Sequence, residues 1–135
     1  MQIINLTPHP VVVLQNSLEH GGIVGYTGNP TKPTQGLFRI LATLPPSGKV
    51  ARAVQSDVTT GMVPVNDGTV TVVRSTYGAP TDLPEPVDGV MLVVSIITAQ
   101  AAKSAGRSTG DLLITADPVR DETGKIIGCQ KFSTL

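Results

Sequence analysis

The chain has 135 residues, of which 40% are hydrophobic and 15% charged, and its formal net charge is zero. This length suits one folded domain over residues 1–135, and the apolar content excludes a disordered chain. Zero net charge argues against binding to a nucleic acid polymer, which needs a surplus of Lys and Arg. A single cysteine excludes an internal disulfide, and we see no signal peptide and no apolar run of transmembrane length. We therefore expect a cytoplasmic protein without membrane association.

The first predicted strand covers Gln2–Leu6 and ends at Thr7-Pro8-His9-Pro10. The two prolines fix their own φ angles and hold Thr7 and His9 in extended conformations. A rigidly presented histidine can contact a ligand or act as a general base. It can equally serve as a hydrogen-bonding support for its turn. A second strand is predicted from Val11.

The middle of the chain favours hairpins. Gly36–Leu44 and Lys49–Val58 both alternate or carry β-forming residues, and the turn Pro45–Gly48 between them predicts that they pair with each other. Asn66-Asp67-Gly68 is the strongest hairpin loop in the sequence. It joins the expected strands Met62–Val65 and Thr69–Arg74, and Thr59-Thr60-Gly61 is expected to separate this hairpin from the preceding one.

The loop Ser75–Asp88 contains three prolines, and its length is typical of a functional loop or a lid. Tyr77 within it could stack on a planar ligand, or it could pack beneath its own loop. Both interpretations stay open on the sequence.

The strongest pattern lies between residues 89 and 116. Val90–Val94 reads as a buried strand, Ser95 as an N-cap, and Ile96–Ala105 as a helix whose inner residues are alanine and isoleucine. Gly106 stands where a left-handed residue ends a helix. A further strand, Leu112–Ala116, completes a β-α-β crossover, which predicts two parallel strands with a right-handed connection.

The last predicted strand, Lys125–Phe132, is expected to run antiparallel to the Leu112–Val119 region. Cys129 within it reads as a buried, inert thiol rather than a nucleophile. The predicted fold class is therefore α+β, with a mixed, mostly antiparallel β-sheet, one β-α-β crossover and a single main helix at about residues 96–105.

The crossover also predicts where a ligand would bind. The carboxyl ends of two parallel strands lie at one edge of a sheet, so Ser95, the helix N-terminus and the segment Asp117–Asp121 should converge there. Exposed N–H groups at a helix start favour anions. The alternative is that Ser95 only caps its helix and that Arg120 and Asp121 only shape a turn. The predicted ligand-binding residues are Thr7, His9, Tyr77, Ser95, Thr98, Arg120 and Asp121.

These residue types suit a phosphate or a ribose, and we expect no metal site and no cofactor. Two His and one Cys at unrelated spacings do not predict zinc binding. Phosphodiester chemistry remains open if His9 and Arg120 come together in space.

Three motifs resemble a family of short, largely uncharacterised proteins from bacteriophages, prophages and actinobacterial genomes. They are the N-L-T-P-H-P run at Asn5–Pro10, the segment Ser95–Leu113, and V-R-D-x-x-G-x-I-x-G-C at Val119–Cys129. The resemblance covers about half of the chain and leaves out Asn16–Asp67. It implies a habitat, the cytoplasm of a bacterial host, and imports no activity.

Three functional hypotheses follow, and enzyme activity stays open among them. The first is a phage-type accessory protein with an anti-defence role, a sponge that binds and sequesters a small nucleotide-derived signalling molecule of host defence. The second is a metal-independent phosphodiesterase in which His9 helps to cleave a cyclic nucleotide. The third is a structural or virion-associated module without a ligand. Few charges beside many apolar residues also leave room for a homo-oligomer interface.

Overall fold

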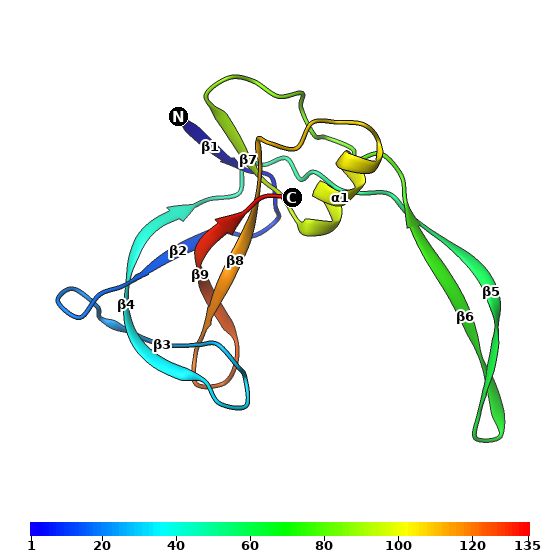
Figure 1. The fold of residues 1–135 in the computed structure, drawn as a ribbon, viewed down its shortest axis with the longest axis horizontal. Coiled ribbons are helices and arrows are strands. Elements are labelled where there is room, and N and C mark those ends of the chain that lie inside the picture. The colour runs from blue at the N-terminus through cyan, green and yellow to red at the C-terminus, as the bar shows by residue number, and fades with distance from the viewer.

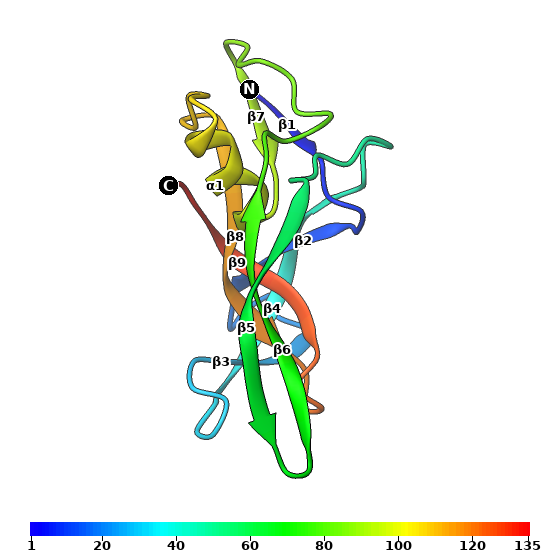
Figure 2. The same ribbon diagram turned by 90° about the vertical axis from the view of Figure 1, so that its right-hand side faces the viewer.

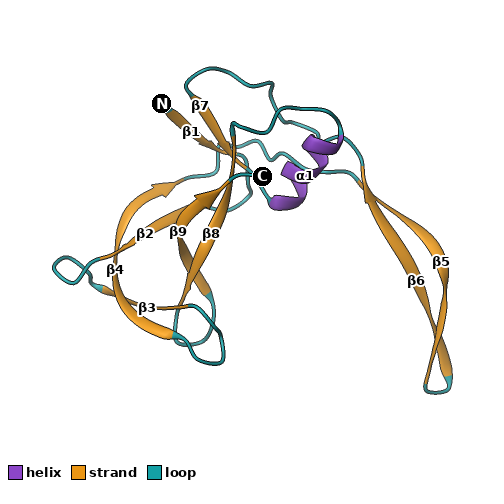
Figure 3. Ribbon diagram, in the orientation of Figure 1, coloured by secondary structure: helices purple, strands orange, loops and turns teal.

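The computed structural model describes all residues, 1–135, as nine strands and one helix (Figure 1). The molecule is mostly β with one short helix, and its main sheet is mixed, as the α+β prediction requires (Figure 3). The elements in chain order are β1 Gln2–Asn5, β2 Val11–Asn16, β3 Ile23–Thr27, β4 Thr34–Leu44, β5 Gln55–Val65, β6 Gly68–Tyr77, β7 Val90–Val93, α1 Ile96–Ser104, β8 Leu112–Arg120 and β9 Ile126–Ser133.

The β-α-β crossover is confirmed. β7 pairs in parallel with β8, with Leu92 opposite Leu112 and Val93 opposite Leu113, and α1 connects the two strands. β1 adds to the other side of β7, also in parallel. The helix packs closely on the sheet through small residues, because Ala99, Ala101 and Ala102 are its buried apolar residues.

The two isoleucines at the start of α1 were expected to lie on its inner side, and this expectation is wrong. Ile96 and Ile97 are exposed. They occupy the first turn, whereas the buried positions of the helix are Thr98 and the alanines that follow it.

Five strands close on themselves next to this unit. β8 pairs with β3, β3 with β4, β4 with β2, and β2 with β9, which returns to β8 (Figure 1). The antiparallel pairing of β9 with β8 confirms the predicted last strand. The result is a small barrel that shares β8 with the β-α-β unit, not a simple antiparallel sheet.

Apolar side chains fill the barrel. Leu14, Phe38 and Val119 form one buried cluster inside it. Gly25 allows this packing, because a Cβ built at this position would collide with a methyl group of Val119 and lie 3.0 Å from the Phe38 ring. A second cluster combines residues of the β-α-β unit, such as Leu92, Ala99 and Leu112, with Leu6 and Ala51 from outside it.

The predicted hairpin between residues 36–44 and 49–58 is wrong. β4 is a strand, but its partners are β2, which pairs with residues 38–44, and β3, which pairs with residues 34–38, and the segment after the turn does not pair with it. The residues after the turn instead form hydrogen bonds with segments that are distant in the sequence. The amide of Ala51 donates to the Leu6 carbonyl at 3.0 Å, and Arg52 bridges to Thr81.

The predicted loop at Asn66-Asp67-Gly68 is confirmed, and the hairpin that it closes is longer than expected. β5 and β6 pair from Gln55 opposite Tyr77 to Val65 opposite Gly68. The segment Thr59-Thr60-Gly61 does not separate two hairpins. It forms a β-bulge within β5, which allows the strand to continue through it. We call this two-stranded element, residues 55–77, the arm; it projects away from the barrel (Figures 1 and 2).

Candidate functional site

The N-L-T-P-H-P motif is a turn built around a buried asparagine. Asn5 is 2% exposed, and its side-chain amide donates to the carbonyls of His9 at 2.8 Å and Leu44 at 3.0 Å. Its Oδ1 accepts from the Thr7 amide at 2.9 Å and from the Thr7 hydroxyl at 2.6 Å. All hydrogen-bonding positions of one side chain therefore hold the β1–β2 turn in place. Sequence reasoning missed Asn5, although an Asn two residues before Thr-Pro is a recognisable turn signal.

Ser95 is confirmed as the N-cap of α1. Its backbone is extended, with φ −68° and ψ 155°, and its Oγ accepts from the Thr98 amide at 3.2 Å. The Ser95 hydroxyl donates to Thr98 Oγ1 at 2.9 Å, and Thr98 Oγ1 donates to the Ala51 carbonyl at 3.2 Å. This chain of hydroxyls ties the start of the helix to the segment before the arm. The amides of Ile96 and Ile97 in the first helical turn are left without intrahelical acceptors.

A pocket of about 260 Å³ lies beside this helix start, at the base of the arm, and we call it the arm-base pocket. It brings together four of the seven predicted ligand-binding residues. They are Thr7, Tyr77, Ser95 and Thr98. Tyr77 closes the arm opposite Gln55 and is 41% exposed, so part of its ring is available to a ligand. Thr98 is 1% exposed, so it supports the pocket from behind.

Sequence reasoning did not single out two further polar residues of this pocket, Arg52 and Gln55. Arg52 is exposed, and the structure gives its guanidinium no hydrogen bond or ion pair. The sequence contained no clear signal for either residue, because both fell in a segment that was expected to pair with β4.

A larger groove of about 1080 Å³ is also lined by Thr7 and Ser95, and we call it the body groove. The β1–β2 turn, the start of β2, the end of β7 and residues of β8 and β9 form its walls, and most of its lining is apolar. Its polar side chains come from Thr7, His9, Ser95, Thr115 and Lys125. The imidazole of His9 makes no hydrogen bond, and only the His9 carbonyl is engaged by the turn.

Cys129 also lines the body groove and is buried, as the sequence predicts. Burial raises the pKa of the Cys129 thiol, because desolvation disfavours the thiolate. The thiol therefore stays protonated at neutral pH, which fits an inert residue.

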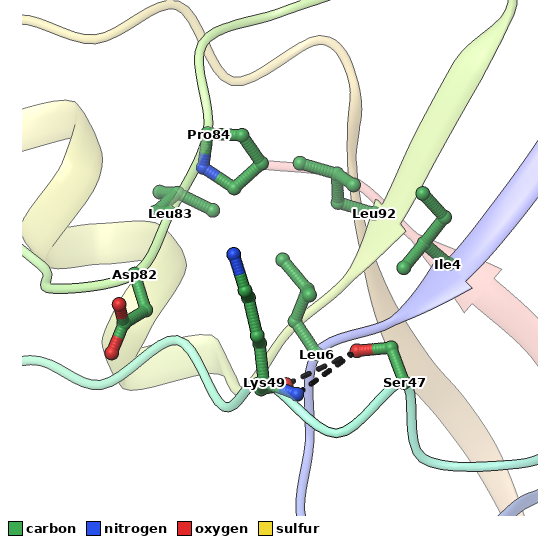
Figure 4. Close-up of a pocket in the computed structure, with 8 residues that line it drawn as sticks. All are labelled: Ile4, Leu6, Ser47, Lys49, Asp82, Leu83, Pro84 and Leu92. Atoms are coloured by element: carbon green, nitrogen blue, oxygen red, sulfur yellow. Dashed lines mark hydrogen bonds between the residues drawn. The ribbon is translucent and has the colours of Figure 1, made fainter.

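A third hollow of about 440 Å³ lies under the loop that follows the arm (Figure 4). Leucines and Ile4 line it from several elements, and the Lys49 side chain points into it beside Leu6 and Leu83 (Figure 4). Asp82 stands at its rim and makes no ion pair with Lys49. None of the predicted site residues lies here.

The predicted convergence of Ser95 with Arg120 and Asp121 is wrong. The strands are parallel as expected, but β8 does not end at Ala116; it continues to Arg120 and enters the barrel, where Arg120 pairs with Tyr26. From the pairing of Val93 with Leu113, the offset along the sheet between Ser95 and Arg120 is five residues, or about 16 Å. The two residues therefore stand at different ends of the barrel wall.

Arg120 and Asp121 serve the β8–β9 turn. Arg120 donates to the Gly124 carbonyl at 2.9 Å. Asp121 Oδ1 accepts from the Thr123 hydroxyl at 2.6 Å and from the amides of Thr123 and Lys125 at 2.9 and 3.0 Å. These bonds, with that of the Thr123 hydroxyl as the largest cause, lower the pKa of Asp121. The motif at Val119–Cys129 is thus accounted for by a turn and the strand that follows it.

No family model, no curated protein and no solved structure matches the chain. The family resemblance of the three motifs stays a prediction. The one helix, with nine residues, is too short to cross a membrane.

Proposed function

We propose that the protein binds a small nucleotide-derived anion in the arm-base pocket. One observation carries this proposal: an accessible aromatic ring, the start of a helix and an unpaired arginine line the same pocket, through Tyr77, Ser95 and Arg52. A base can stack on the tyrosine ring, with a favourable energy of about 1–3 kcal/mol. A phosphate can be held by the guanidinium and by the free amides of the first helical turn.

The volume of the pocket sets the size of the ligand. At about 260 Å³ it lies just below the usual range for drug-sized ligands, so it suits a single nucleotide unit with part of its surface exposed. This supports the first hypothesis, in which the protein is a phage-type accessory protein that sequesters a nucleotide signal of host defence. The turn at Asn5–Pro10, which carries part of the family resemblance, supplies Thr7 and Pro8 to the same pocket.

The hydrolytic alternative has less support. His9 lines the body groove and not the arm-base pocket, and its imidazole lacks a hydrogen-bonding partner that would orient it as a general base. A histidine that does not face the proposed ligand cannot take a proton from it. The structural alternative is favoured by a different observation, the exposed arm, which is treated below.

Binding and cleavage are separated by one experiment. The full chain is incubated with a panel of mononucleotides, cyclic nucleotides and ADP-ribose-type molecules, filtered, denatured by heat, and the released molecules are analysed by chromatography. Capture predicts depletion of one ligand before heating and its intact recovery afterwards. New products would support hydrolysis instead, and no depletion of any compound would contradict both.

Variants then test the assigned pocket. We expect Arg52→Ala and Tyr77→Ala each to weaken binding by about tenfold or more, while Tyr77→Phe retains most of the affinity because it keeps the ring. Arg39→Ala is the matched control, since Arg39 is an exposed arginine of β4 outside the pocket. Equal losses in Arg52→Ala and Arg39→Ala would show only a general effect of charge and would contradict the site.

A further inference from the structure

The arm has one face made largely of valine. Residues that pair directly across two strands place their side chains on the same side, and the pairing shifts by one residue at the bulge near Thr60. One side of the arm therefore collects five valines, with exposed fractions between 39% and 53%. They are Val58, Val63, Val65, Val70 and Val72, and we call this side the valine face; Arg74, opposite Val58, is the one charged residue on it and lies at its inner end.

The opposite side of the arm is more polar. Asp57 accepts hydrogen bonds there from Gln55 at 3.1 Å and from the Ser75 hydroxyl at 2.8 Å. Further out, threonines share this side with Met62 and Val73; the threonines are Thr59, Thr69 and Thr71. The valine face is thus a feature of one side and not of the whole arm.

Nothing in its own chain covers the valine face. Every residue of β5 and β6 is exposed, and the arm stands apart from the barrel (Figure 1). A two-stranded hairpin in water is marginally stable by itself, and clustered exposed apolar residues mark an interaction surface. The arm therefore needs a partner surface that its own body cannot supply.

The body groove has the matching chemistry. Its lining is mostly apolar, and its only charged or titratable side chains besides Cys129 are His9 and Lys125, with no acidic residue. The tip of the arm carries Asp67, next to the outermost valine. The three outer rows of the valine face carry no charge and end at the acidic tip, so they are complementary in polarity and in charge to an apolar groove with a lysine at its wall, while Arg74 lies inside these rows, toward the base of the arm.

The dimensions also agree. The three outer rows of the valine face run from Gly68 to Val72, a span of about 14 Å. The β8 wall of the groove runs from Ile114 to Pro118, a span of about 13 Å.

We propose that the valine face of the arm of one copy packs into the body groove of a second copy of this chain. Both surfaces lie on one chain, so a two-fold arrangement can satisfy both arms at once and close the assembly. The zero net charge of the chain removes long-range repulsion between copies. This proposal does not rest on ligand binding, because the groove and the arm-base pocket share only Thr7 and Ser95 among the residues that line them.

Sedimentation velocity of the full chain tests the association. We expect a dimer or a larger closed assembly at micromolar concentration. Val63→Lys on the valine face and Ile126→Lys in the groove should each weaken association by about tenfold or more, because each places a charge in an apolar contact. Thr69→Lys, on the opposite side of the arm, is the matched control and should retain wild-type association.

Mixing the two defective variants sharpens the test. The Val63→Lys chain keeps an intact groove and the Ile126→Lys chain keeps an intact arm, so the mixture should associate more strongly than either chain alone. Circular dichroism and thermal unfolding check that each variant is folded. A wild-type chain that stays monomeric at up to about 100 μM would overturn the proposal. So would association that survives in Ile126→Lys, or that Thr69→Lys weakens as much as Val63→Lys.

Discussion

The barrel and the arm are both built from strands with alternating apolar residues, but these residues are buried in the barrel and exposed in the arm. In the barrel, five strands cover one another, and Leu14, Phe38 and Val119 are at most 2% exposed. In the arm, two strands pair only with each other, and valines of the same alternating pattern remain about half exposed. Alternation determines which side chains share a face, but only the neighbouring strands determine whether that face is covered.

The largest contrast is expected from removing an apolar side chain. Phe38→Ala should lower the free energy of unfolding by about 3–5 kcal/mol, because it leaves a cavity among Leu14 and Val119. Val70→Ala in the arm should change it by less than about 0.5 kcal/mol in dilute protein, since the side chain is 53% exposed. Urea unfolding of both variants measures the difference.

If Phe38→Ala does not fold, Phe38→Leu provides a smaller cavity for the same measurement. A cost for Val70→Ala equal to that of the Phe38 variant would mean that the arm is packed within the monomer.

Substitution of Asn5 tests how much the hydrogen bonds of the β1–β2 turn contribute to stability. Asn5→Ala should cost about 1–3 kcal/mol or more, because the carbonyls of His9 and Leu44 and the amide of Thr7 lose their partner in a buried turn. Asn66→Ala is the matched change in the arm, at a loop residue with φ 53°, and its cost should be only the smaller one of a left-handed alanine. Equal unfolding midpoints for wild type and Asn5→Ala would show that the network does not stabilise the body.

Adding a methyl group at a glycine tests the same contrast between the packed barrel and the open arm. Gly25→Ala should destabilise the protein by about 1–3 kcal/mol, since the added methyl group meets Val119 and Phe38. Gly61→Ala in β5 meets no atom within 4 Å, so it should be neutral or slightly stabilising. Thermal unfolding of the pair is sufficient, and a Gly61→Ala variant as unstable as Gly25→Ala would contradict the open arm.

The smallest expected effect is on the pH dependence of stability, and it comes from residues outside the arm. Arg107 holds Asp111 through two hydrogen bonds of 2.8 Å and also donates to the Pro84 carbonyl, so it fixes the loop after the arm. The hydrogen bonds from Arg107 lower the pKa of Asp111. A lowered carboxyl pKa stabilises the fold above the ordinary value of about 3.9, and this stability is lost as the pH falls through the lowered value.

Asp111→Asn should therefore reduce stability at pH 7 and flatten its decline below about pH 4. The measurement is the urea midpoint as a function of pH. If the urea midpoint of the variant falls at acidic pH as much as that of the wild type, other carboxylates are responsible for the loss of stability. Asp57 in the arm, which also has a lowered pKa because Gln55 and Ser75 donate to it, is fully exposed and should contribute little.

Local signals in the sequence were sufficient for much of the fold. The helix with its Ser95 cap, the parallel strands around it and the loop at Asn66–Gly68 depend on neighbouring residues, and all are confirmed. The closed barrel depends on pairings between distant strands, such as Tyr26 with Arg120, which no local pattern encodes. The same is true of β4, whose local pattern predicted a hairpin with the segment that follows it, whereas its partners are the preceding strands β2 and β3.

The candidate site was predictable only in part, and for a similar reason. One pocket is lined by four of the predicted residues, Thr7, Tyr77, Ser95 and Thr98. Arg120 does not line it, because β8 continues four residues beyond its expected end at Ala116. Pro118 lies within this longer strand, opposite Cys129. Arg52 takes the place that was assigned to Arg120, and only the path of the chain after β4 brings it there.

Hydrogen–deuterium exchange of the arm amides, followed by mass spectrometry as a function of protein concentration, tests the central claim most directly. If a second copy covers the valine face, peptides from residues 58–72 should exchange slowly at high concentration and at least about tenfold faster after dilution, while barrel peptides from β4 and β8 stay protected throughout. Arm peptides that exchange at the same rate at every concentration would contradict the claim that the arm is completed by another copy of the chain.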